Sequence, residues 1–492
     1  MSSLQLTDFS DRFPPMLVKE LRQGLRAKTF IGVFLALQIF LAVMLFSASA
    51  ASNSDQVGGI VSGVLFGFFA IAVIVVQPLR GTNALAAEIK GQTIDMMVLT
   101  RLSAWRIVFG KWFAIVSQSA LLLSAIIPYL ILRYFLGGMN LVGEIVFLFL
   151  LFLTSMGITA VTVGLSGCTS VIVRSLLPVI GLPFLAYILL MLSFSGAMGG
   201  GNSLIEICAL DSTESRIGVL CYILAIIYLS YSLLSMGASL IAPAAENHSA
   251  VRRLLALALL AATAFSGFFE LLDEAPTIIL ICLIAIPAVI IALVESGPLV
   301  QTVRRPFEKF GPPGKLLGHF LYPTWSSGVF FAVILTILAI ISIFGHGLLI
   351  PGSTTMLRDF FSSSDADDKV IVFAIAGGFF FPALWQMIFF RGEGQRVANY
   401  LLILTGSYVL LGVLSALTNA MESSIFLLFF AWNPLVFLPI MDEGSFRDST
   451  LLVAILFIVS LTFLALLLGA IRHAGSQHIG IDESEPTPPQ AD

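Results

Sequence analysis

The chain has 492 residues, of which 58% are hydrophobic and only 11% are charged, and its mean hydropathy is +1.00. This composition lies far outside that of soluble domains and predicts an all-α polytopic membrane protein. The net charge of −4 leaves no basic field for nucleic acid, so we expect no nucleic-acid partner. The four cysteines show neither a CxxC pair nor metal-ligand spacing, so we expect no metal site and favour free thiols over a disulfide between Cys208 and Cys221.

The first predicted element is an amphipathic helix over residues 13–28. Leu17, Leu21 and Leu25 recur at every fourth residue, whereas Arg22 and other polar side chains take the opposite face. Such a helix suits the membrane interface. A cytoplasmic tail that simply follows the charge rules explains the pattern equally well.

Twelve apolar segments are long enough to cross a bilayer, which takes about 20 residues. They are 29–50, 58–78, 107–135, 141–167, 175–196, 217–242, 254–269, 276–294, 327–350, 369–390, 398–418 and 449–471. The shorter apolar stretch 425–440 is either re-entrant or a thirteenth span. We favour twelve spans, because the acidic loop after this stretch and the basic Arg472 both fit a return to the outer side. Lys and Arg are concentrated in the segments that lie inside when the N-terminus is cytoplasmic.

The polar stretch 78–111 lies between the second and third predicted spans. It carries five basic residues, which predicts a position on the cytoplasmic side. Its middle has the spacing of a short amphipathic helix, and a plain solvated loop is the alternative. The order of its residues resembles the second-to-third-span loop of ABC-2-type exporter permeases, E-x-x-G-T-x-[DE]-x-L-x-x-T-P-L-S followed by G-K. The residues that carry this likeness and the expected coupling role are Glu88, Gly91, Thr93, Asp95, Leu99, Thr100, Leu102, Ser103, Gly110 and Lys111.

The resemblance covers roughly residues 13–245 and implies that the loop forms a coupling helix, which docks on a separately encoded ATPase subunit. The helix over 13–28 is then the family's interfacial helix before the first span. A second permease chain, or the second half of this one, would complete the path. The resemblance also implies a multi-pass protein of the bacterial inner membrane.

We do not expect this chain to catalyse a reaction by itself. The segment Gly311–Lys315 lacks the spacing and the Ser or Thr of a phosphate loop, so we expect no ATPase site, no catalytic residue and no cofactor apart from ATP on the partner. The predicted spans carry no ionisable residue near their middle, which argues against an ion-coupled carrier. Gly157, Gly164 and Gly167 suit close helix packing.

The sequence therefore divides into four predicted parts. Residues 1–245 form the permease-like half, 246–326 two further spans and a Pro/Gly-rich cytoplasmic linker, 327–472 a second membrane half that is either a degenerate repeat or unrelated, and 473–492 a disordered acidic tail. The expected function is an exporter permease for an amphiphile such as a lipid, polysaccharide or drug. The alternatives are an ion-coupled secondary transporter and a non-transporting membrane scaffold.

Overall fold

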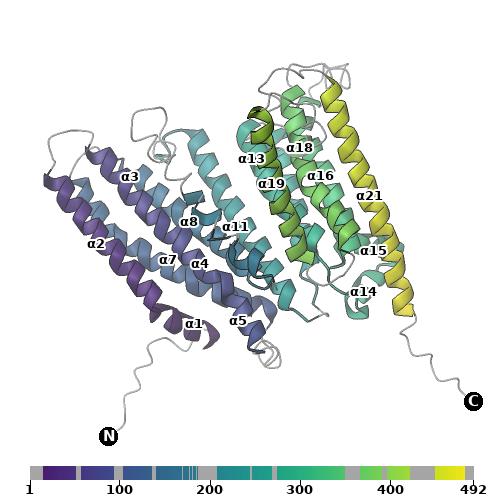
Figure 1. The fold of residues 1–492 in the computed structure, drawn as a ribbon, viewed down its shortest axis with the longest axis horizontal. Coiled ribbons are helices and arrows are strands. Elements are labelled where there is room, and N and C mark those ends of the chain that lie inside the picture. The colour runs from purple at the N-terminus through teal and green to yellow at the C-terminus, as the bar shows by residue number, and fades with distance from the viewer. Residues whose placement is uncertain are drawn as a thin grey trace, which may run out of the picture. The chain divides into compact units, whose positions relative to one another are not determined.

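The structure is a computed structural model of the chain. It describes residues 15–50, 57–92, 103–135, 140–168, 170–176, 178–179, 181–183, 185–186, 208–243, 246–268, 274–348, 366–390, 396–420 and 449–482. The elements in these ranges are helices (Figure 1). They group into two compact units, Met1–Pro243 (unit 1) and Ala244–Asp492 (unit 2), each with its own helix packing.

Unit 1 begins with a short helix, α1, that precedes the long apolar helices. Its elements are α1 (Pro15–Leu25), α2 (Lys28–Ala50), α3 (Val57–Ala70), the π-helix η1 (Ile71–Val76), α4 (Gln77–Leu79), the 3₁₀-helix η2 (Arg80–Asn83), α5 (Ala84–Lys90), α7 (Ala104–Tyr134), α8 (Leu141–Leu165), the π-helix η3 (Ile172–Leu176) and α11 (Thr213–Ile241). Phe66, Phe69 and Leu122 are among the fully buried side chains of its core.

Unit 2 consists of long apolar helices and two short ones. They are α12 (Ser249–Phe268), α13 (Glu274–Val294), α14 (Gln301–Glu308), α15 (Gly311–Leu321), α16 (Trp325–Leu348), α18 (Ala366–Phe389), α19 (Arg396–Ala420) and α21 (Ser449–Asp482). The helix α21 runs to Asp482, so the helical chain extends past the point where the sequence predicts the tail to begin.

The prediction of an all-α polytopic membrane protein is confirmed. Among the described residues, ten helices are long and apolar enough to cross a membrane. Each coincides with a span expected from hydropathy. The predicted span 369–390 corresponds to α18, whose apolar run Phe373–Phe389 is shorter. The predicted span 175–196 lies largely outside the described residues, and the stretch 425–440 lies wholly outside them.

The second predicted span continues well beyond its expected end at residue 78. The chain stays helical from Val57 to Lys90, through a π-helical and a 3₁₀ segment. Pro78 is tolerated because it occupies the first turn of a new helical segment, where a missing N–H does least harm. The Leu85 N–H donates to Ser166 Oγ at 3.1 Å, which satisfies a free donor at the start of α5.

Glycines allow the backbones of α8 and α11 to approach closely. A Cβ on Gly164 would lie 2.5 Å from the Leu233 carbonyl oxygen, and one on Gly237 would lie 2.9 Å from Gly164 Cα. Gly157 and Gly167 also face side chains of α11. The sequence prediction that these small residues pack helices together is confirmed.

Candidate functional site

A buried lysine joins three elements at one end of unit 1. The Lys111 ammonium, on α7, lies 3.0 Å from Glu20 Oε1 of α1 and 3.1 Å from Glu88 Oε1 of α5. The lysine side chain is 7% exposed and the two carboxylates 18% and 17%. One cation therefore neutralises two partly buried anions from separate helices, and we call these three residues the Lys111 cluster. Figure 1 shows α1 and α5 at the same end of unit 1.

An arginine adds a second link between the same elements. Arg80 donates to Gln77 Oε1 at 3.1 Å, to Gln118 Oε1 on α7 and to the Gly24 carbonyl oxygen of α1 at 3.3 Å. A Cβ at position 24 would meet the end of the Gln118 side chain, which would have to shift away from its place beside Arg80. The end of α1 is thus held against the helical segment that leads into α5.

The predicted coupling residues are only partly within the described chain. Glu88 and Lys111 are brought together, whereas Gly91 forms an exposed turn after α5 and Ser103 begins α7 by accepting from the Arg106 N–H at 3.0 Å. Gly110 is buried within α7. The predicted residues outside the described ranges are Thr93, Asp95, Leu99, Thr100 and Leu102.

The predicted amphipathic helix forms as α1 and packs on α7. Leu17, Leu21 and Leu25 are half-buried, and Arg22 is exposed. Sequence reasoning missed Glu20, which is the acidic ligand that α1 supplies to the Lys111 cluster. The sequence held a signal for this ion pair, because Glu20 is the lone acidic residue in the basic stretch 13–28.

A buried polar seam runs beside the π-helix η1 of unit 1. Ser155 Oγ donates to the Val73 carbonyl oxygen at 2.6 Å and lies 3.3 Å from Ser119 Oγ. Gln77 Nε2 and Thr159 Oγ1 are buried and have no hydrogen-bond partner among the described residues. Buried polar groups are normally paired, and π-helical turns recur at functional sites. Gln77 Nε2 and Thr159 Oγ1 are therefore the groups of this seam that could bind a water molecule or a polar group of a ligand.

Unit 2 contains a buried ionic cluster that the sequence did not indicate. Glu295, at the end of α13, pairs with both Arg252 and Arg253 of α12 and accepts from Ser249. Burial would raise the pKa of the Glu295 carboxyl, but the two guanidiniums and the hydrogen bonds outweigh it. The pKa is therefore lowered from its usual range, and the group stays ionised. The sequence prediction used Arg252 and Arg253 only as positive charges that orient the chain in the membrane. Glu295 follows the next predicted span on the same predicted side of the membrane, and this shared side was the available signal for an ion pair.

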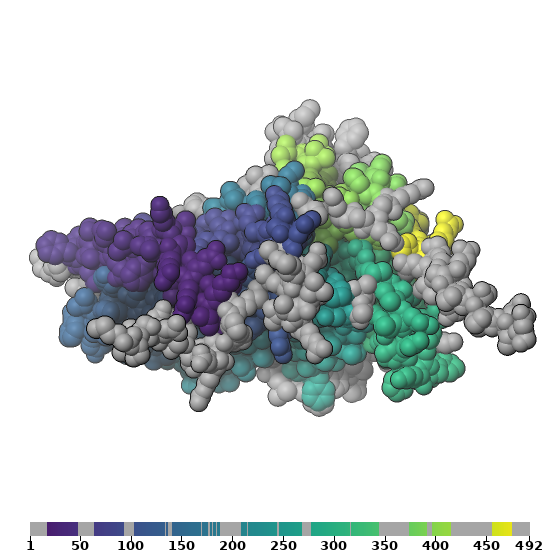
Figure 2. Space-filling model, turned by 90° about the horizontal axis from the view of Figure 1, so that it is seen from below, coloured from purple at the N-terminus to yellow at the C-terminus, as the bar shows by residue number. Residues whose placement is uncertain are grey.

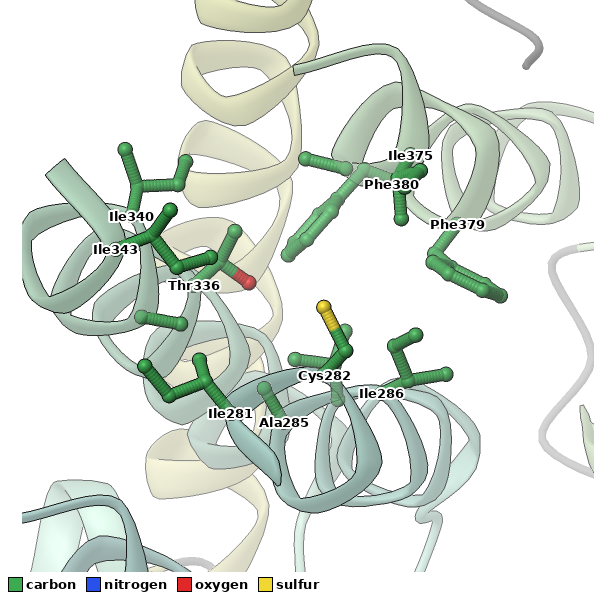
Figure 3. Close-up of a pocket in the computed structure, with 13 residues that line it drawn as sticks. Ile281, Cys282, Ala285, Ile286, Thr336, Ile340, Ile343, Ile375, Phe379 and Phe380 are labelled. Atoms are coloured by element: carbon green, nitrogen blue, oxygen red, sulfur yellow. The ribbon is translucent and has the colours of Figure 1, made fainter. Parts of the chain in front are cut away.

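An apolar pocket lies between α13, α16 and α18 of unit 2 (Figure 3). It encloses about 460 Å³ with its open mouth, and the Cys282 thiol and the Phe380 ring point into it. The Thr336 hydroxyl also lines it but donates to the Ala332 carbonyl oxygen at 2.8 Å. A pocket with this apolar lining suits a hydrocarbon group.

Within the described ranges, no group of three or more His, Cys, Asp or Glu side chains could hold a metal ion. No protein-family model matches the chain, and neither a curated protein nor a solved structure shows significant similarity to it.

Proposed function

We propose that the chain is the membrane-spanning permease subunit of an ATP-driven ABC exporter, powered by a separate ATPase subunit. The observation that supports it best is the Lys111 cluster, which ties α5, and hence the segment that follows it, to α1 and α7. A partner that pulls on this segment moves an amphipathic helix and a long apolar helix together. Such a linkage is what a transporter without its own nucleotide site needs.

In this proposal the loop after α5 is cytoplasmic, as is the N-terminus, and the chain crosses the bacterial inner membrane twelve times. The ATPase contacts the loop through Asp95 and neighbouring side chains. Its motion reaches the polar seam beside η1 through the Lys111 cluster, because α7 carries both Lys111 and Ser119. A second permease chain, or the second half of this one, would complete the translocation path.

The polar seam and the apolar pocket support an amphiphilic substrate, such as a lipid, a polysaccharide carrying a lipid group, or a drug. Taken separately, unit 1 has buried polar groups beside η1, and the pocket of unit 2 accepts a hydrocarbon group.

Co-purification of vanadate-sensitive ATP hydrolysis with tagged full-length variants tests the proposal. Asp95→Ala should lose most of the associated ATPase at normal expression, since loss of one partner in a buried interfacial charge pair costs about 2–5 kcal/mol of association. Arg216→Ala is the matched control, because Arg216 is exposed and lies in a segment predicted to be on the outer side, away from the loop. Equal ATPase retention by both variants and the wild type would contradict docking at this loop.

A further inference from the structure

Two short helices link the ends of two long apolar helices in unit 2. Six residues separate the end of the apolar helix α13 from the start of this link, α14 and α15, which leads into α16. Between residues 301 and 321 it carries four basic residues and one acidic residue. In the view of Figure 2, from below, the teal-green region that includes α14 and α15 is exposed.

One face of α15 packs against α14 and against Tyr322, the residue that ends the helix, and α15 also contacts α12 and α16. A Cβ on Gly314 would lie 2.1 Å from the Phe307 carbonyl oxygen, and one on Gly318 would lie 2.5 Å from the Tyr322 ring. Leu321, on the same face, is buried. The helix therefore has a defined rotation about its axis, and the side chains on its other faces have defined directions.

A second face of α15 exposes large apolar side chains. Phe310, at its start, is 77% exposed, and Leu316 and Leu317 are 67% and 53% exposed. The other exposed large apolar side chains in the described part of unit 2 lie on the long apolar helices or directly at the end of one. His319 is exposed as well, and at 100° per residue it falls outside the arc of Leu316 and Leu317.

Hydrogen bonds connect the C-terminal end of α15 to the ends of the long helices. Arg253 Nη1 of α12 donates to the Phe320 carbonyl oxygen at 2.6 Å, and Asn247 Nδ2 donates to the Leu321 carbonyl oxygen at 3.2 Å. The Gly297 N–H, just after α13, donates to the Pro323 carbonyl oxygen at 2.8 Å. The start of α12, the end of α13 and the start of α16 thus meet at α15, at the boundary of the apolar layer.

We propose that α14 and α15 form an interfacial element that binds the surface of an anionic lipid bilayer. Phe310, Leu316 and Leu317 enter the boundary between headgroups and acyl chains. The basic side chains, such as Arg305 and Lys309, contact lipid phosphates. Amphipathic helices with apolar and basic faces bind membranes in this way, and the helices already lie at the membrane boundary.

Nitroxide labels on the full-length protein in nanodiscs test this binding. Single cysteines replace Leu316, Leu317 or His319 in a variant whose four native cysteines are alanine and whose elution profile matches the wild type. In nanodiscs with anionic phosphatidylglycerol, labels at 316 and 317 should be accessible to oxygen and shielded from a water-soluble nickel complex. The label at 319, the matched control on the same helix, should be accessible to nickel.

Lipid charge supplies the second arm of the test. The double variant Arg305→Gln/Lys309→Gln should weaken the insertion of α15 into the surface of anionic nanodiscs by about fivefold per charge removed. Its insertion into zwitterionic nanodiscs should change little. Nickel access at 316 and 317 equal to that at 319 would overturn the proposal. Shielding of these two labels from nickel that is equal in anionic and zwitterionic nanodiscs would also overturn it. Shielding that develops only when another protein is added would overturn it too, because this face would then be a protein-docking surface.

Discussion

Replacing Lys111 with methionine is the sharpest perturbation of unit 1, because it removes the charge and keeps most of the side-chain volume. The variant leaves Glu20 and Glu88 without their shared cation. Breaking a buried pair by removing one partner costs about 3–5 kcal/mol. Both carboxylates keep some exposure, so water screens part of the loss and we expect about 1–3 kcal/mol.

The matched control neutralises all three residues at once. Lys111→Met combined with Glu20→Gln and Glu88→Gln leaves none of these three side chains charged, so its stability should lie closer to that of the wild type than the stability of the single variant does. Thermal stability of the detergent-solubilised chain, followed by the loss of its monodisperse elution peak, gives the comparison. A single variant as stable as the triple variant would refute the reasoning that the lysine holds the two helices by charge.

The remaining predictions concern other parts of the described chain. Gly164→Val should destabilise unit 1 by about 1–3 kcal/mol or more through overpacking against α11, whereas Gly218→Val, which has open space, should not, as measured by the same elution assay. Burial raises the pKa of the Cys168 thiol to about 11, so at pH 8 its alkylation should be about 100-fold slower than that of an ordinary thiol and should accelerate as pH rises. Arg253→Met should cost about 1–3 kcal/mol, because it removes the donor to the Phe320 carbonyl oxygen and to Ser327 while Arg252 still pairs with Glu295, and Arg305→Met, on the exposed side of α14, should cost far less by the same thermal measurement.

Hydropathy predicted the long helices well, because a membrane span must bury about 20 apolar residues and satisfy its backbone internally. The continuation of the second span to Lys90 could not be predicted in this way. The segment after Pro78 carries several polar residues, yet Arg80 and Glu88 are half-buried and pair with distant residues of α7, Arg80 with Gln118 and Glu88 with Lys111. Pairings across long sequence separations leave no periodic pattern in either partner.

The ionic clusters show the same limit. Glu88 and Lys111 were predicted site residues because they match the loop pattern of ABC-2-type permeases, whereas Glu20 is 91 residues from Lys111 and is brought to it by the packing of α1 on α7. Likewise Glu295 meets Arg252 and Arg253 because α12 and α13 pack side by side. Charge counts placed these residues on one side of the membrane, but contact between them depends on tertiary packing.

Reconstituted transport tests the central claim most directly. The full-length chain and its co-purified ATPase are placed in proteoliposomes, and movement of a fluorescent phospholipid is followed with ATP, with a non-hydrolysable ATP analogue, and with a proton gradient alone. We predict movement with ATP only, and its loss in Lys111→Met while the ATPase stays bound. Movement driven by the proton gradient without ATP would contradict the assignment as an ABC exporter permease.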